Sequence, residues 1–197
     1  MIAIFDYGAG NLQSVQNTLA EIGATYTVTS NSGGLRAASK IILPGVGHFG
    51  QIMRSLDTLQ VRQTLLERIK AGVPFLGICL GLQALLTGSE EAAEAPGLGL
   101  YPGIVRRFPL DARVPHMGWN QLEPKSPTKL LSNLDPQPYV YFAHSYYVPE
   151  SPVTAARCTY AVPYTAILED RNVFGVQFHP EKSGPVGLQI VRNFLEL

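Results

Sequence analysis

A cysteine framed by two glycines has the clearest chemical signature in this chain. Segment 73–83, VPFLGICLGLQ, passes from apolar residues into Gly-Ile-Cys-Leu-Gly and then into helix-forming residues. The small Gly77 and Gly81 allow a sharp strand-to-helix turn that leaves the Cys79 sulfur accessible as a nucleophile. The N-terminus of the following helix favours the thiolate, and the Leu80 N–H is placed to bind an oxyanion. The segment therefore predicts a nucleophile elbow.

A histidine with a carboxylate two residues later supplies the expected base. In segment 173–182, VFGVQFHPEK, His179 and Glu181 lie at positions i and i+2, which share a face in extended backbone, and Pro180 ends the strand pairing. Glu181 then orients His179, and with Cys79 the two residues make a triad for acyl transfer. Taken singly, the histidine segment is a strand-ending turn and the cysteine a small buried apolar residue. The glycine frame around the cysteine favours the triad.

A glycine-rich segment predicts the second half of an oxyanion hole. Residues 41–49, IILPGVGHF, form an apolar strand that breaks into Pro-Gly-Val-Gly. With Gly45 and Gly47 on either side of Val46, a backbone N–H can turn toward a substrate carbonyl and complete the hole begun by Leu80. An ordinary strand-to-helix loop explains this segment equally well when it is taken alone.

The elements that must position these residues indicate an α/β fold. Strands are expected at 2–5, 25–29, 40–43 and 73–78, and helices at 11–22, 51–71 and 80–87. This alternation predicts a mostly parallel central sheet with helices on both faces. Residues 87–102 read as a loop, and the short β-branched and aromatic runs after Pro102 predict antiparallel hairpins. A last helix is expected at 184–196, with Ser183 as its cap.

Composition limits the classes of function. The chain has 197 residues, 46% hydrophobic and 15% charged, which predicts one globular domain over 1–197. Lys plus Arg and Asp plus Glu number 15 each, so neither nucleic acid nor an anionic membrane is an expected partner. The sequence has no apolar run of membrane-spanning length and no signal-peptide pattern. A nucleophilic Cys79 must stay reduced, which predicts a cytoplasmic protein in which Cys158 is a core residue.

No metal and no cofactor are expected. Segment 7–13 follows a strand and opens a helix, but Gln13 occupies the third glycine position of a dinucleotide-binding fingerprint. The histidines at 48, 116 and 144 are too scattered, without Cys or carboxylates at ligand spacing, to indicate zinc.

The three chemical segments, in this order, resemble the triad-type (class I) glutamine amidotransferases over nearly the whole chain. Six short segments resemble, more narrowly, the glutaminase subunits of imidazole glycerol phosphate synthase, a branch of that family. The segments are FDYGAGNL at 5–12, PGVGHF at 44–49, GICLG at 77–81, VPHMGWN at 114–120, YFAHSY at 141–146 and QFHPEKS at 177–183. Leu82 stands where Met is common after the elbow, a volume-conserving difference.

The resemblance implies a flavodoxin-like fold, a substrate and a partner. On this resemblance, we expect L-glutamine to be hydrolysed through a Cys79 thioester and the ammonia to pass to a cyclase subunit with a (β/α)8 barrel. In such a heterodimer the cyclase is expected to make imidazole glycerol phosphate and aminoimidazole carboxamide ribotide, in histidine biosynthesis. The resemblance also implies a set of glutamine-binding residues: Gly45, Gly47, Gln83, Glu91, Ser145 and Tyr146. By its sequence context alone, Glu91 belongs to a solvated acidic loop.

Four residues are expected at the partner interface or its gate. The resemblance places Asn11 toward the partner and Tyr141 between the two sites, and His48 lies beside the oxyanion segment. Trp119 is either an interface anchor or a core residue. An amidotransferase subunit of another pathway, a free-standing γ-glutamyl cysteine hydrolase and a non-catalytic regulatory subunit remain as alternatives. The intact triad argues against the last of these.

Overall fold

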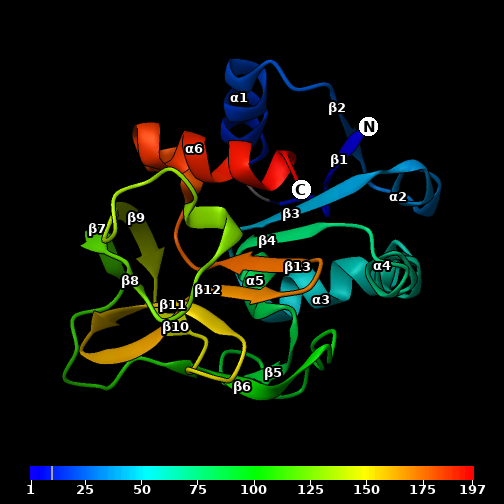
Figure 1. The fold of residues 1–197 in the computed structure, drawn as a ribbon. Coiled ribbons are helices and arrows are strands. Elements are labelled where there is room, and N and C mark those ends of the chain that lie inside the picture. The colour runs from blue at the N-terminus through cyan, green and yellow to red at the C-terminus, as the bar shows by residue number, and fades with distance from the viewer. Residues whose placement is uncertain (10) are drawn as a thin grey trace.

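The computed structural model describes residues 1–9 and 11–197, which build an eight-stranded central sheet (Figure 1). Its strands are β1 (Ile2–Phe5), β2 (Tyr26–Thr29), β3 (Lys40–Gly45), β4 (Phe75–Cys79), β8 (Glu123–Pro124), β11 (Thr154–Tyr160), β12 (Val162–Asp170) and β13 (Val173–Val176). They are ordered β2-β1-β3-β4-β13-β12-β11-β8. The first five in this order pair in parallel and the rest pair antiparallel, which confirms the predicted mostly parallel sheet.

Two smaller sheets add to the antiparallel pairing of the second half, which also includes β8, β11 and β12 of the central sheet. One contains β5 (Leu86–Ser89), β6 (Tyr101–Arg107) and β10 (Tyr146–Tyr147), in the order β10-β6-β5. The other is the antiparallel pair β7 (His116–Gln121) and β9 (Tyr139–His144). Because β9 leads directly toward β10, these sheets bring residues 141–147 close to the carboxyl end of the central sheet.

Helices cover both faces of the central sheet. They are α1 (Leu12–Ile22), α2 (Ser32–Ala37), α3 (Phe49–Thr58), α4 (Arg62–Lys70), α5 (Leu80–Gln83) and α6 (Gly184–Leu195), with 3₁₀ turns η1 (Lys129–Leu131) and η2 (Pro180–Lys182). Figure 1 shows α1 and α6 on one face and α3 and α4 on the other. In β1, Ala3 and Phe5 join the apolar cluster under α3 and α4, whereas Ile2 and Ile4 join the cluster under α1 and α6. Because successive side chains of a strand point to opposite faces, the strands contribute to one apolar core on each face of the sheet.

The helix expected at 51–71 is two helices. The chain breaks after α3, where Gln60 adopts φ 54°. The Gln60 N–H donates to the Asp57 carbonyl and the Val61 N–H to the Leu56 carbonyl, which is the bonding of a Schellman C-cap. The cap uses Gln where Gly is the usual residue, so this position carries no local signal that a helix ends there.

The helix expected at 80–87 is also wrong in its second half. α5 ends at Gln83 and the chain enters β5, so the predicted loop at 87–102 begins and ends within strands. Leu86 pairs with Tyr101 and Ser89 with Val105 in a parallel ladder. This long-range pairing overrides local helix propensity. Among the described residues, no helix has both the length and the apolar character needed to cross a membrane.

Candidate active site

The predicted elbow is present at the carboxyl end of β4. Cys79 is the last residue of the strand and Leu80 the first of α5. The Cys79 backbone has φ 52° and ψ −103°, a left-handed φ that is costly for a residue with a Cβ. Such strain is the expected conformation of a nucleophile on a strand-to-helix turn. Because β4 lies between β3 and β13, the cysteine stands at the centre of the sheet edge.

Three glycines let the surrounding backbones approach each other. A Cβ on Gly81 would lie 2.0 Å from the Leu43 carbonyl oxygen, and one on Gly77 would lie 2.5 Å from the Gly81 oxygen. A Cβ on Gly45 would lie 2.6 Å from the Gly81 nitrogen. The elbow therefore needs glycine at these positions for close packing, while the unusual φ belongs to Cys79 itself.

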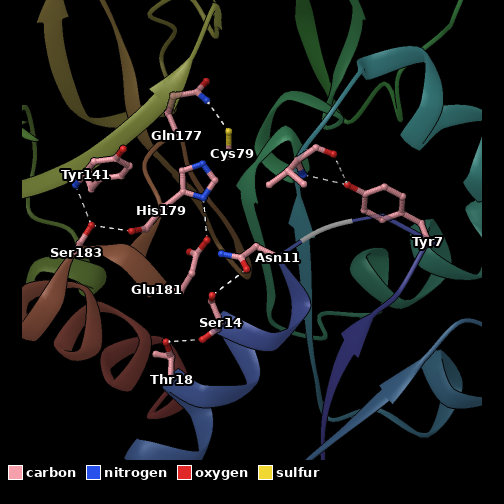
Figure 2. Close-up of polar contacts among 11 residues, drawn as sticks. Tyr7, Asn11, Ser14, Thr18, Cys79, Tyr141, Gln177, His179, Glu181 and Ser183 are labelled. Carbon is pink, nitrogen blue, oxygen red and sulfur yellow. Dashed lines mark hydrogen bonds and ion pairs between the residues drawn. The ribbon is translucent and has the colours of Figure 1, made fainter. Parts of the chain in front are cut away.

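His179 and Glu181 make the predicted pair, by a different backbone route. His179 Nδ1 lies 2.8 Å from Glu181 Oε1, and each side chain is 3% exposed. His179 is extended, but Pro180 begins the 3₁₀ turn η2, so Glu181 approaches the ring through a turn rather than along a strand. Figure 2 shows the imidazole between Cys79 and Glu181.

Cys79 and Glu181 control the charge of His179. Burial lowers the pKa of His179, but the charge of a Cys79 thiolate and a hydrogen bond to its sulfur, together with Glu181, outweigh burial and raise that pKa to about 10. At neutral pH the imidazole ring beside the sulfur is therefore doubly protonated and positively charged. A protonated histidine beside the nucleophile is ready to donate its proton to a leaving group.

Ser183 is the N-cap residue of α6, as predicted, but its side chain makes no capping hydrogen bond and holds the histidine segment instead. The Ser183 hydroxyl donates to the His179 carbonyl at 2.7 Å and accepts the Tyr141 N–H at 2.9 Å. The His179 N–H in turn donates to the Tyr141 carbonyl at 2.9 Å. A buried serine that is committed to these groups has no lone pair in position for the helix amides. Its bonds fasten the histidine to β9 (Figure 2).

Gln177 is a site residue that sequence reasoning missed. Its fully buried side chain donates from Nε2 to Cys79 Sγ at 3.5 Å, and its Oε1 accepts Gln83 Nε2 at 3.2 Å. Gln83 also donates to the Tyr146 carbonyl at 2.9 Å. Gln177 directly follows β13 and lies two residues before His179, and this closeness in sequence is the signal that could have found it.

A cavity of about 240 Å³ opens at Cys79 and His179. Its size suits a ligand much smaller than a drug-sized molecule. It is lined by both predicted oxyanion residues and by most of the predicted glutamine-binding residues: Val46, Leu80, Gly47, Gln83, Glu91, Ser145 and Tyr146. Gly45 is not part of the lining, because it packs against α5 behind the cavity.

The two predicted oxyanion donors differ in their present partners. Leu80 begins α5, where an N-terminal N–H has no intrahelical acceptor. The Val46 N–H instead donates to the Tyr7 hydroxyl at 3.1 Å. Val46 thus reaches the cavity while its N–H is bonded elsewhere.

Glu91 lies at the cavity and not in a freely solvated loop. Its Oε2 accepts the Phe49 N–H at 2.7 Å, at the start of α3. His48 caps the same helix, because its Nδ1 accepts the Gly50 N–H at 3.1 Å. The Glu91 carboxylate is therefore fixed at the cavity wall by the N-terminus of α3.

The predicted interface residues have different surroundings. Trp119 is 56% exposed, so the core interpretation is wrong. It packs edge-on against Tyr141, with ring centroids 6.2 Å apart. His48 is exposed, and Asn11 is half-buried and accepts the Ser14 hydroxyl at 2.8 Å. The contacts of these four residues with a partner remain predictions.

Two buried histidines, of which His144 lines the cavity, share one tyrosine hydroxyl. His116 Nδ1 and His144 Nε2 lie 3.1 and 3.3 Å from the Tyr164 hydroxyl. Burial lowers the pKa of His116 to about 4 and that of His144 to about 3, so both rings are neutral. Over the described ranges, no three residues among His, Cys, Asp and Glu gather as a metal site would require.

Nearly the whole chain matches one protein family. The family model described as glutamine amidotransferase class-I covers residues 3–197. A Methanothermobacter thermautotrophicus protein named imidazole glycerol phosphate synthase subunit HisH is 51% identical over 198 residues, which cover 100% of this chain and 98% of that protein. The subunit of the same name from Deinococcus radiodurans is 46% identical over 197 residues, which cover 98% and 92%.

The solved structures agree on the fold. A crystal structure described as a glutamine amidotransferase has a TM-score of 0.78 at 19% identity and covers 99% of this chain and 97% of its own. At that identity the match concerns the fold alone. The full-length family match and the relatives at 46% identity or more carry the assignment. This chain belongs to the class-I glutamine amidotransferase family.

Proposed function

We propose that this chain is the glutaminase subunit of imidazole glycerol phosphate synthase, which hydrolyses L-glutamine and supplies ammonia to a cyclase in histidine biosynthesis. The HisH subunits at 46 to 51% identity over the whole chain support the pathway. The single observation that carries the chemistry is the small cavity with Cys79 and His179 at its base, where His179 is bonded to Glu181. The proposed reaction needs no cofactor.

The proposed reaction is an acyl transfer in two steps. The Cys79 thiolate attacks the side-chain amide carbon of glutamine, and the His179 imidazolium gives its proton to the departing ammonia. Water then attacks the glutamyl thioester while His179 takes up the water proton, which releases glutamate and restores the thiolate. Glu181 keeps the imidazole oriented throughout. Leu80 and Val46 N–H groups bind the oxyanion that forms in each step.

Glutamine binding is proposed from charge and position. The carboxylate of Glu91 lines the cavity and is fixed by the Phe49 N–H, so it is placed to bind the α-ammonium group. Main-chain groups of Ser145 and Tyr146 and of Gly47 hold the rest of the substrate. Gln83 positions the Tyr146 carbonyl through its 2.9 Å hydrogen bond.

The proposed partner surface is the exposed face of β7 and β9. Trp119 pairs with Tyr141 and Gln121 with Tyr139, so alternate residues of both strands share this face. Met117 is 64% exposed, Trp119 56% and Tyr139 55%. Apolar side chains gathered on one exposed face indicate a protein-binding site. We propose that the cyclase, a (β/α)8 barrel, docks here to form a heterodimer.

Replacing Trp119 with Ala is expected to weaken the complex by about 2 kcal/mol, roughly a thirtyfold rise in Kd. A large ring on an exposed face contributes its area only when a partner covers it. The melting temperature of the isolated chain should stay close to that of the wild type. Titration of the cyclase by calorimetry measures the effect, and Leu110→Ala, which removes another exposed side chain outside this face, is the control. Unchanged affinity would remove Trp119 from the interface.

The isolated chain is expected to hydrolyse glutamine poorly and to gain roughly 10²- to 10³-fold in kcat when the cyclase holds its own ligand. The reason is that one oxyanion donor, the Val46 N–H, is bonded to Tyr7 in the chain alone. A partner that binds the two arrangements unequally shifts the population toward the active one. Glutaminase kcat is measured for the chain alone, with free cyclase and with ligand-loaded cyclase. Three equal values would favour the free-standing hydrolase.

The proposed chemistry also sets the compartment. Cys79 must stay reduced to act as a nucleophile, and it and Cys158 are both free and buried. A reducing compartment meets this need, which supports the cytoplasm as the site of action.

We further propose that residues 1–197 act as one domain, because the two apolar clusters share the central sheet.

A further inference from the structure

Tyr7 bridges the two peptide groups on either side of Val46. Its ring is buried just after β1, and its hydroxyl accepts the Val46 N–H at 3.1 Å and donates to the Val46 carbonyl at 3.0 Å (Figure 2). The N–H belongs to the peptide that joins Gly45 to Val46, and the carbonyl to the one that joins Val46 to Gly47. One hydroxyl therefore fixes the orientation of both peptide groups.

The bridge keeps the Val46 N–H out of the cavity. Val46 lines the cavity beside Cys79 and Leu80, whereas Tyr7 does not. An N–H that donates to Tyr7 has its hydrogen directed toward the tyrosine, away from the position of a substrate carbonyl. Glycines flank Val46, and Gly47 has φ 99°, so the backbone has a second orientation available once both bonds break.

The hydroxyl is suited to this double role because it stays neutral. Burial raises the pKa of Tyr7 to about 12, the Val46 hydrogen bond opposes the rise, and the charges of Cys79 and Asp6 add to it. A neutral phenol both donates and accepts, whereas a phenolate only accepts. Both bonds to Val46 are therefore compatible with neutral pH.

We propose that Tyr7 is a positioning residue that holds Val46 in a resting orientation and so suppresses glutamine hydrolysis until the partner docks. The proposal rests on the glutaminase function proposed above. Each end of the bridge precedes a residue predicted to face the partner: Tyr7 lies shortly before Asn11, and Val46 lies two residues before the exposed His48. Movement of either segment on docking loosens the two bonds and frees the N–H for the oxyanion.

Tyr7→Phe is the direct test, because it keeps the ring and removes the hydroxyl. The isolated variant should hydrolyse glutamine roughly tenfold faster than the wild type, with KM unchanged, because the freed N–H acts on the transition state. Activity with the ligand-loaded cyclase should stay within about twofold of wild type, so the stimulation ratio falls. Tyr101→Phe is the control. It removes another partly buried hydroxyl, the one bonded to Asp170 at 3.2 Å, and should change neither value.

The outcomes separate this proposal from the function beneath it. If the wild type is stimulated by the cyclase but Tyr7→Phe alone is no faster than wild type, the resting role is wrong. If Tyr7→Phe is slower both alone and in the complex, Tyr7 supports the active orientation instead, and the proposal is also overturned. A wild-type complex that hydrolyses no glutamine would contradict the proposed function itself.

A second measurement does not depend on the variant. In the wild-type chain, the Val46 amide should exchange with solvent slowly while it is bonded to the buried Tyr7 hydroxyl. Binding of the ligand-loaded cyclase, without glutamine, should reduce the protection of this amide at least tenfold, as followed by nuclear magnetic resonance. The Val61 amide, bonded to the Leu56 carbonyl in the cap of α3, serves as the internal reference. Equal protection of Val46 in the free chain and the stimulated complex would overturn the proposal.

Discussion

Cys79→Ala is expected to lower glutamine hydrolysis by about 10⁴-fold or more, while the complex still makes product from added ammonium salt. The alanine cannot form the thioester, so no ammonia is generated from glutamine. The cyclase reaction itself does not use the Cys79 sulfur, and free ammonia replaces the missing supply. Glutamate release and product formation are measured in parallel, with glutamine or ammonium as the nitrogen source.

Cys158→Ala is the matched control for this experiment. Cys158 is the other cysteine of the chain, and it is fully buried in the apolar cluster under α1 and α6, as its core assignment predicted. Burial raises the pKa of its thiol to about 11, which leaves it unreactive. Its loss should therefore cost stability rather than glutaminase activity. Hydrolysis at the wild-type rate by Cys79→Ala would refute the elbow assignment.

His179→Asn is expected to lower glutamine hydrolysis nearly as much as Cys79→Ala, and Glu181→Gln is expected to be roughly tenfold to a hundredfold milder. The histidine supplies the proton for departing ammonia and accepts one from water, so its removal stops both steps. The glutamate only orients and charges that ring. A glutamine at 181 can still accept the Nδ1–H through its carbonyl oxygen at the present 2.8 Å.

The order of these two effects is the critical result. Glu181 Oε2 is buried and has no hydrogen-bond partner among the described residues. An amide nitrogen placed there would be buried without an acceptor, so Glu181→Gln should also lower the melting temperature slightly. Single-turnover glutamate release separates this loss of stability from the chemical step. A Glu181→Gln complex that is less active than His179→Asn would contradict the assigned roles.

The sequence was most informative where a short pattern of residue types is typical of one chemical function. The glycine frame of Cys79 and the two-residue spacing of His179 and Glu181 singled out three residues that the fold brings together at one sheet edge. Strand and helix alternation likewise predicted the parallel sheet, because buried parallel strands read as short apolar runs. These signals are local in sequence, and the parallel sheet brings the segments that carry them to the carboxyl ends of neighbouring strands.

The features that the sequence did not predict depend on contacts between distant residues. Ser183 is a residue type that often caps helices, yet its hydroxyl is hydrogen-bonded to the Tyr141 N–H and the His179 carbonyl instead of the helix amides. β5 forms only because β6 offers a parallel partner. The bridge from Tyr7 to Val46 joins residues 39 apart, and no spacing rule relates them. Such contacts require the fold before they can be found.

Ammonia released at Cys79 is expected to be the nitrogen source of the partner. The most direct measurement supplies the reconstituted complex with glutamine labelled with nitrogen-15 in its amide, together with excess unlabelled ammonium, and determines the isotope in the imidazole product by mass spectrometry. We expect wild-type product to carry mainly the label, and Cys79→Ala product to carry none. Wild-type product whose label matches the ammonium pool, or labelled product from Cys79→Ala, would show that ammonia does not pass from Cys79 to the partner.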